Sequence, residues 1–93
     1  MIECSEGRCL LKGAVNLETA LFLRGEGLRL FTAPEVTLDL SGVTEVDSSA
    51  VSLLFEWRRA ALAAKRNIRY VNLPENLISL ARLYGVTELV GAE

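Results

Sequence analysis

The polar run Asp47-Ser48-Ser49 holds the side chains best suited to chemistry, directly before an apolar stretch that begins at Ala50. Aspartate and serine are preferred helix N-cap residues, so the ordinary interpretation is a cap worth about 1 kcal/mol. The alternative is that Ser48 is a phosphorylation or docking site, because exposed N–H groups and the helix dipole stabilise a phosphate. Such a phosphate would add about −2 charge beside Asp47 and would weaken the docking of a partner on neighbouring apolar side chains.

The residues on which many enzymes and metal sites depend are missing. The sequence contains no histidine, which excludes Ser-His-Asp and Cys-His catalysis and most zinc sites. It has no GxxxxGK[ST] loop, and Gly25-Glu26-Gly27 does not follow a predicted strand as a dinucleotide-binding fingerprint would. Asp39 and Asp47 flank a predicted turn, but an acid–base pair of carboxylates needs a cleft. We therefore expect a protein that is not an enzyme and that uses no cofactor and no metal.

The two cysteines, Cys4 and Cys9, flank a short segment that could be a hairpin turn, in which case they would face each other. No apolar run approaches the ~20 residues that span a bilayer, and the N-terminus lacks the apolar core of a signal peptide. We therefore expect a protein of the cytoplasm. Because that compartment is reducing, two free thiols are the favoured interpretation of the cysteines.

Length and composition indicate one folded domain over residues 1–93. Apolar residues make up 51% of the chain and the formal net charge is −2, which is typical of a globular protein. There is no basic run and no interleaving of basic and aromatic residues, so nucleic acid is not an expected partner.

The polar run lies between a predicted strand and a predicted helix. Apolar residues alternate with polar ones from Val36 to Leu40, a period typical of a strand, and Ser41-Gly42 is expected to end it. From Ala50 the apolar spacing becomes helical. The stripe predicted to face the core consists of Ala50, Leu53, Leu54, Trp57, Ala61 and Ala64.

A second apolar group lies beside that stripe. It consists of Val51, Phe55 and Leu62, with Arg58 between them and Ser48 near their N-terminal end. A two-layer domain buries one stripe of a helix, so this flank has the composition of a partner-docking patch. The alternative is that a further helix, predicted near residues 77–84, covers the flank.

The N-terminal part of the chain predicts two short strands and a helix. The strands fall at residues 2–4 and 9–12, and Gly13 is expected to end the second. The helix is N-capped by Asn16, and glycines 25 and 27 should bend or fray it while permitting close packing against a neighbouring helix. Its apolar positions are Leu17, Ala20, Leu21, Leu23, Leu28 and Phe31.

The remaining elements complete an alternating order. A strand is predicted at residues 68–72, and Pro74 precedes a helix whose core face is Leu77, Leu80, Ala81 and Tyr84. Leu89-Val90 is expected to add a last pairing or to pack on the core. The order β-β-α-β-α-β-α predicts an α/β fold with a mixed, mostly parallel four-stranded sheet and about three helices packed largely on one face.

The segment 38–54 (LDLSGVTEVDSSAVSLL) resembles the STAS family, which includes the anti-sigma factor antagonists and the C-termini of sulfate transporters. The family pattern is a strand ending in D-L-S, a turn, and D-[ST]-[SG]-G-L at a helix start, and the resemblance extends over residues 13–90. It implies a small mixed sheet with helices largely on one side, and it places the family's phosphorylatable residue at Ser48. Ala50 and Asn16 depart from the antagonist pattern, which argues against a kinase-regulated switch.

The segment 80–86 (LARLYGV) looks like the MlaB-like members of the family, the STAS subunits of Mla-type ABC transporters. This resemblance implies a non-catalytic accessory subunit, peripheral to the inner membrane, that binds the cytoplasmic ATPase of a phospholipid transporter maintaining outer-membrane lipid asymmetry. The residues expected to bind that partner are Ser48, Val51, Phe55, Arg58 and Leu62, with Asp47 beside Ser48. The alternative is an anti-sigma factor antagonist that binds an anti-sigma kinase and is regulated by phosphorylation of Ser48.

Overall fold

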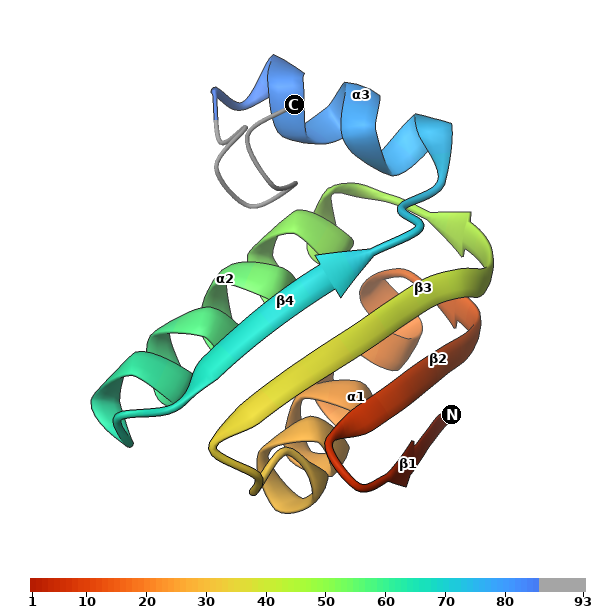
Figure 1. The fold of residues 1–93 in the computed structure, drawn as a ribbon. Helices are drawn as coiled ribbons and strands as arrows, with labels where there is room; N and C mark the ends of the chain where they lie inside the picture. The colour runs from red at the N-terminus through yellow and green to blue at the C-terminus, as the bar shows by residue number, and fades with distance from the viewer. Residues whose placement is uncertain (86–93) are drawn as a thin grey trace.

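The computed structural model describes residues 1–85, and these form alternating strands and helices in the predicted order (Figure 1). The elements are β1 (Ile2–Ser5), β2 (Arg8–Val15), α1 (Leu17–Leu30), β3 (Glu35–Val46), α2 (Ser48–Ala63), β4 (Asn67–Val71) and α3 (Glu75–Leu83). The contribution predicted for Leu89-Val90 falls outside the described residues.

The four strands form one mixed sheet in the order β1-β2-β3-β4. β1 pairs antiparallel with β2 at the edge, whereas β2 with β3 and β3 with β4 are parallel. Helix α1 connects the first parallel pair and α2 the second, as parallel neighbours require. The predicted α/β class, with a mixed and mostly parallel four-stranded sheet, is confirmed.

Strands β2 and β3 run past the glycines that were expected to end them, so those predicted boundaries were wrong. β2 continues to Val15 and β3 to Val46. Their pairing shifts register between Leu10 and Lys12 and again after Gly13, whose φ is +96°. Such a backbone is typical of a glycine at a bulge, which bends the strand without ending it. A glycine within a bulge cannot be told from a strand-ending glycine by sequence alone.

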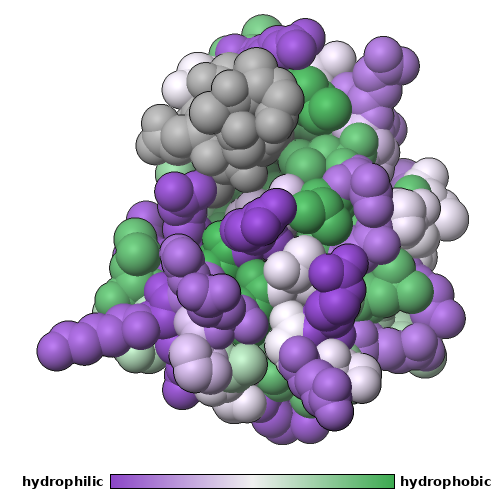
Figure 2. Space-filling view, in the orientation of Figure 1, coloured by the Kyte–Doolittle hydropathy of each residue, from purple (hydrophilic) through white to green (hydrophobic). Residues whose placement is uncertain are grey.

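One face of the sheet lies under α1 and α2, and within residues 1–85 no helix covers the other, open face (Figure 1). The inward strand residues that form the core with these helices are Ile2, Cys9, Leu11, Val15, Val36, Leu38, Leu40, Ile68 and Tyr70. The open face shows mainly hydrophilic side chains with scattered apolar ones (Figure 2). Helix α3 lies at one end of the sheet and packs against α2.

Helix α2 buries the stripe predicted for it over most of its length. Ala50, Leu53, Leu54 and Trp57 are buried, whereas Ala61 is half-buried and Ala64 is exposed as the C-cap. The Tyr70 hydroxyl of β4 donates a hydrogen bond of 2.7 Å to the Leu54 carbonyl oxygen, which ties α2 to the sheet. This anchored helix carries the candidate site.

Helix α1 packs differently from the prediction. It runs unbroken from Leu17 to Leu30 and buries Leu23 and Gly27, while Leu17 and Leu21 are exposed. At Gly27 the Trp57 indole of α2 comes so close that a Cβ would overlap it. The close-packing interpretation is therefore confirmed for Gly27, and the helix does not fray at either glycine. The indole brings the Gly27 side of α1 onto the core, which turns Leu17 and Leu21 outward.

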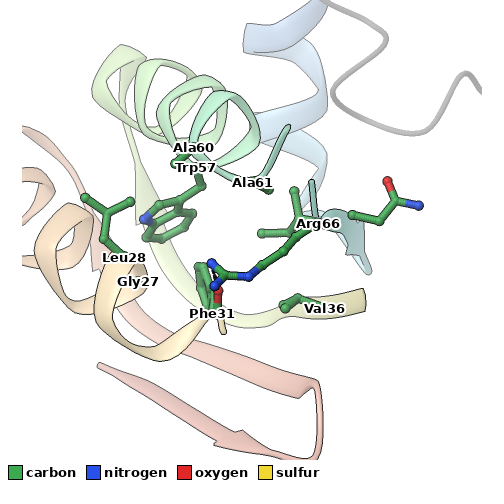
Figure 3. A pocket seen from close by; sticks show the side chains of 10 residues that line it. Gly27, Leu28, Phe31, Val36, Trp57, Ala60, Ala61 and Arg66 are labelled. Carbon is green, nitrogen blue, oxygen red and sulfur yellow. Dashed lines mark hydrogen bonds between the residues drawn. The ribbon is translucent and has the colours of Figure 1, made fainter. Parts of the chain in front are cut away.

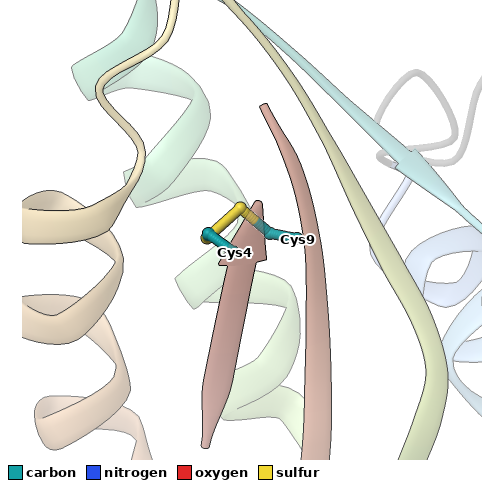
Figure 4. The surroundings of a disulfide bond; sticks show 2 residues. All are labelled: Cys4 and Cys9. Atoms are coloured by element: carbon teal, nitrogen blue, oxygen red, sulfur yellow. A yellow bond between two sulfur atoms is a disulfide. The ribbon is translucent and has the colours of Figure 1, made fainter. Parts of the chain in front are cut away.

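The favoured interpretation of the cysteines as free thiols is wrong in this structure. The antiparallel register places Cys4 directly opposite Cys9, with their Cα atoms 4.0 Å apart, and the two form a disulfide (Figure 4). Directly opposed residues on neighbouring antiparallel strands lie close enough for such a bond. The disulfide joins edge strand β1 to β2.

Candidate docking site

The site begins at Asp47, which is the one of the candidate N-cap residues whose carboxylate caps α2. Asp47 Oδ1 accepts a hydrogen bond of 2.8 Å from the Ser49 amide, and Oδ2 accepts one of 3.1 Å from the Leu17 amide at the start of α1. Partial burial raises the Asp47 pKa, but these N–H donors outweigh it and leave the pKa below its ordinary value. One carboxylate therefore connects the N-termini of both sheet-covering helices.

Asn16 lies beside Asp47 and caps α1. Its Oδ1 accepts hydrogen bonds from the Glu18 and Thr19 amides, and its Nδ2 donates to Glu45 Oε2 at 3.2 Å. The predicted N-cap role is confirmed, and the side chain is held by these contacts. The two capped helix starts lie next to each other, so Ser48 sits in a region rich in N–H groups.

Ser48 is the first residue of α2 and is exposed. Because Asp47 provides the cap, the Ser48 hydroxyl is not needed to start the helix. The structure therefore separates the two roles that the sequence left open, with the cap at Asp47 and an accessible hydroxyl at Ser48.

A groove of about 400 Å³ runs beside Ser48, between the first turns of α2 and the end of α3. Its lining residues are Ser48, Ser49, Val51, Ser52, Phe55 and Tyr84. Three of the residues predicted for partner binding thus come together: Ser48, Val51 and Phe55. Sequence reasoning missed Ser52, although it stands one turn after Ser48, and placed Tyr84 on the core face of its helix, where it is in fact exposed.

The predicted docking flank is divided by burial. Val51 belongs to the core, Phe55 is half-buried, and Leu62 is 63% exposed. The alternative that a third helix covers the flank therefore holds in part, because α3 packs against α2. Arg58 is half-buried and, like Leu62, does not line the groove. The accessible residues of the flank are Ser48, Phe55 and Leu62. We call these three residues, together with the neighbouring Ser52 and Tyr84, the α2 ridge.

A second groove, of about 290 Å³, lies on the other side of α2, against α1. It is lined by Leu17, Ala20, Leu21, Arg24, Ser49, Ser52, Leu53 and Glu56. The Arg24 Nε donates a hydrogen bond of 3.1 Å to Glu56 Oε1 between the two helices. Sequence reasoning missed this groove, because it named Leu17 and Leu21 only as apolar positions and did not predict how the two helices lie side by side.

The small interior pocket between α1 and α2 is not a ligand site (Figure 3). It has a volume of about 30 Å³ beside Gly27, Phe31 and Trp57, which is room for one water. The residues that the structure describes contain no group of three or more histidine, cysteine or acidic residues able to hold a metal. Among residues 1–85, no helix has the length and apolar character needed to cross a membrane.

One family model and two solved structures are similar to this chain. Residues 4–91 match the family model described as "Mlab, STAS domain". The unphosphorylated anti-sigma factor antagonist SpoIIAA is similar in structure, with a TM-score of 0.73 over 96% of this chain and 83% of that one, at 14% identity. A crystal structure of Mglu matches with a TM-score of 0.62 and 23% identity, over 81% of this chain but 19% of that one. At these identities the two structures establish the fold alone. No curated protein matches the chain.

Proposed function

The chain belongs to the MlaB family of STAS domains, and from that premise we propose that it is a non-catalytic accessory subunit that binds the cytoplasmic ATPase of an Mla-type ABC transporter. Through this partner it would lie on the cytoplasmic side of the inner membrane and support phospholipid transport and outer-membrane lipid asymmetry. The protein itself would do no chemistry and would act by binding.

The α2 ridge is the observation that carries this proposal. Ser48, Phe55 and Leu62 are spaced seven residues apart, so they follow one line along α2. The half-buried Phe55 ring and the exposed Tyr84 provide aromatic anchors beside serine hydroxyls that can fix a partner's orientation. A helix or loop of the ATPase that carries apolar side chains would fill the groove between them.

The test is binding of the purified ATPase subunit to the Phe55→Asp variant. A carboxylate in the apolar contact should weaken binding by at least tenfold, because a charge would be buried without a partner. Phe22→Asp is the matched control: it makes the same substitution at an exposed phenylalanine of α1 that lines neither groove, and should leave binding unchanged. A folded Phe55→Asp variant that binds as well as the natural chain would contradict the proposal.

Arg58 and Leu62 extend the proposed contact along α2. If the partner reaches beyond the groove, Leu62→Asp should weaken binding less than Phe55→Asp, because Leu62 is further from the groove and more exposed. Equal effects would place the centre of the interface further along the helix than we propose.

A second candidate function is favoured by one observation, the accessible hydroxyl of Ser48 beside the groove. In that case the chain would be an anti-sigma factor antagonist, released from its partner kinase by phosphorylation of Ser48. A tagged chain purified from its own cells and analysed by mass spectrometry separates the candidates. Recovery of an ABC ATPase with its permease supports the first, and recovery of an anti-sigma kinase supports the second.

A further inference from the structure

Helix α1 exposes a large apolar face that the core does not use. Leu17 is 79% exposed, Leu21 77%, Phe22 67% and Leu28 45%. Together these side chains leave on the order of 500 Å² of apolar surface in contact with water, the size of patch that commonly marks an interaction site. The α2 ridge lies on another helix, so this face needs an explanation of its own.

Gly25 is a second, independent feature of this face. A glycine inside a helix costs about 1 kcal/mol relative to alanine. Gly27 is explained by its contact with Trp57, but Gly25 is exposed and a Cβ placed there would meet no atom within 4 Å. A glycine on an exposed apolar helix face permits another backbone or side chain to approach closely.

We propose that α1 is the contact between two copies of this chain, with the exposed faces of the two α1 helices packed antiparallel about a two-fold axis that crosses the helix at the level of residue 23. The axis places Leu21 of each copy over Gly25 of the other, since the two positions lie two residues on either side of it. Leu17 then lies beside Leu28 of the second copy. The contact is isologous, so the same apolar surface is covered on both copies.

The charges on α1 favour this pairing over other occupants. Glu18 stands near the start of the helix and Arg29 near its end, on the same side, and antiparallel packing brings each near its opposite in the second copy. A parallel pairing would instead place like charges together. The helix carries two glutamates and two arginines, a balance that does not favour an anionic lipid surface.

The size of the contact sets the expected affinity. Two such faces would bury about 1,000 Å² in total, which is at the lower end of specific interfaces. We therefore expect a dimer that forms in the micromolar range or above. The contact does not depend on the proposed transporter role.

Sedimentation equilibrium of the whole chain from micromolar to millimolar concentration tests the proposal. The natural chain should show a monomer–dimer equilibrium, and Leu21→Asp should weaken it by at least tenfold. Leu83→Asp, which alters an equally exposed leucine on α3, should leave it unchanged. Both substitutions are at exposed positions, and circular dichroism would verify that each variant is folded.

A charge exchange tests the antiparallel register. Glu18→Arg and Arg29→Glu should each weaken the dimer, and the double variant should restore it. A natural chain that stays monomeric throughout, or a Leu21→Asp variant that dimerises equally well, would overturn the proposal. So would a monomeric chain whose Leu21→Asp variant loses binding to the ATPase or to phospholipid vesicles, because the face would then belong to that partner.

Discussion

Asp47 and Leu17 stand 30 positions apart in the chain, yet the Leu17 amide donates a hydrogen bond of 3.1 Å to Asp47 Oδ2. The other carboxylate oxygen of Asp47 caps its own helix through Ser49. The first turns of α1 and α2 are thus fixed to each other by one side chain, directly beside Ser48. Within the polar run 47–49, Asp47 therefore stabilises the fold, whereas the neighbouring Ser48 stays accessible.

Asp47→Ala should loosen both helix starts at once. It removes the acceptors for the Ser49 and Leu17 amides, so we expect a clear fall in Tm and faster hydrogen exchange at these two amides. Asp47→Asn is the control, because its remaining side-chain oxygen can still cap α2. A variant in which only the Ser49 amide exchanges faster would show that the bond to α1 contributes nothing.

The carboxylates of Asp39 and Asp47 should make stability fall in acid. The Asp39 pKa lies below its ordinary value of 3.8, first because of the hydrogen bond from the Ser41 amide and then through the Ser41 and Asn72 side chains. A carboxyl whose pKa is lowered by folding stabilises the fold above the unfolded pKa. That contribution is lost as the pH falls from about 3.8 through the folded-state value.

Thermal unfolding measured over this pH range checks the effect. Asp39→Asn should be less stable than the natural chain near neutral pH, and the difference should shrink as the pH falls below the ordinary aspartate pKa. A difference that is constant with pH would mean that ionisation of Asp39 does not contribute.

Gly27→Ala should destabilise the protein by about 1–3 kcal/mol, because the added methyl group must displace the Trp57 indole or the Phe31 ring. These two rings pack edge to face with centroids 5.0 Å apart, so movement of one disturbs the other. Denaturant unfolding measures the loss, and tryptophan fluorescence reports the displaced indole.

Gly25→Ala is the matched control for this prediction. The same substitution two residues earlier meets open space, so it should stabilise the helix by about 1 kcal/mol. Both variants should be compared at low concentration, where self-association is negligible. If both glycine variants shifted stability in the same direction, the close contact at Gly27 would not be limiting.

Tyr70→Phe should cost about 1 kcal/mol, since it removes the buried hydrogen bond to the Leu54 carbonyl oxygen. Burial raises the pKa of the Tyr70 hydroxyl, so the group should stay protonated at alkaline pH values where an exposed tyrosine ionises. Spectrophotometric titration should show the Tyr70 hydroxyl still protonated at such pH values. Ionisation of Tyr70 there in the folded protein would contradict this.

The sequence predicts most of this fold because its strongest patterns are local. The alternation from Val36 to Leu40 and the stripe from Ala50 to Trp57 each have one stable solution, a strand and a helix buried on one side. The α2 side of the candidate site follows from the same stripe, because Phe55 lies beside it. The pairing of Asp47 with Leu17 could not be predicted, since it depends on how two helices are placed side by side.

The predictions that were wrong concern features that depend on contacts between residues far apart in the sequence. Both strand ends were placed too early because Gly13 and Gly42 lie at irregularities of the β2–β3 pairing. The apolar positions of α1 do not show which side of that helix faces the core, because the close contact of Trp57 with Gly27 decides it. Tyr84 was assigned to the core by spacing, and only the position of α3 against α2 shows that it borders the groove.

The Cys4–Cys9 disulfide should measurably stabilise the protein. It closes a short loop that holds edge strand β1 on β2, and Ile2 of β1 contributes to the core. By the loop-entropy argument, a bond over so few residues is worth about 2 kcal/mol, so thermal unfolding with a reductant should show a lower Tm than unfolding without one. The Cys4→Ser/Cys9→Ala variant should show no response to the reductant, which separates reduction of this bond from other effects. Two titratable thiols in the natural chain before reduction, together with an unchanged Tm, would show that the cysteines are not joined.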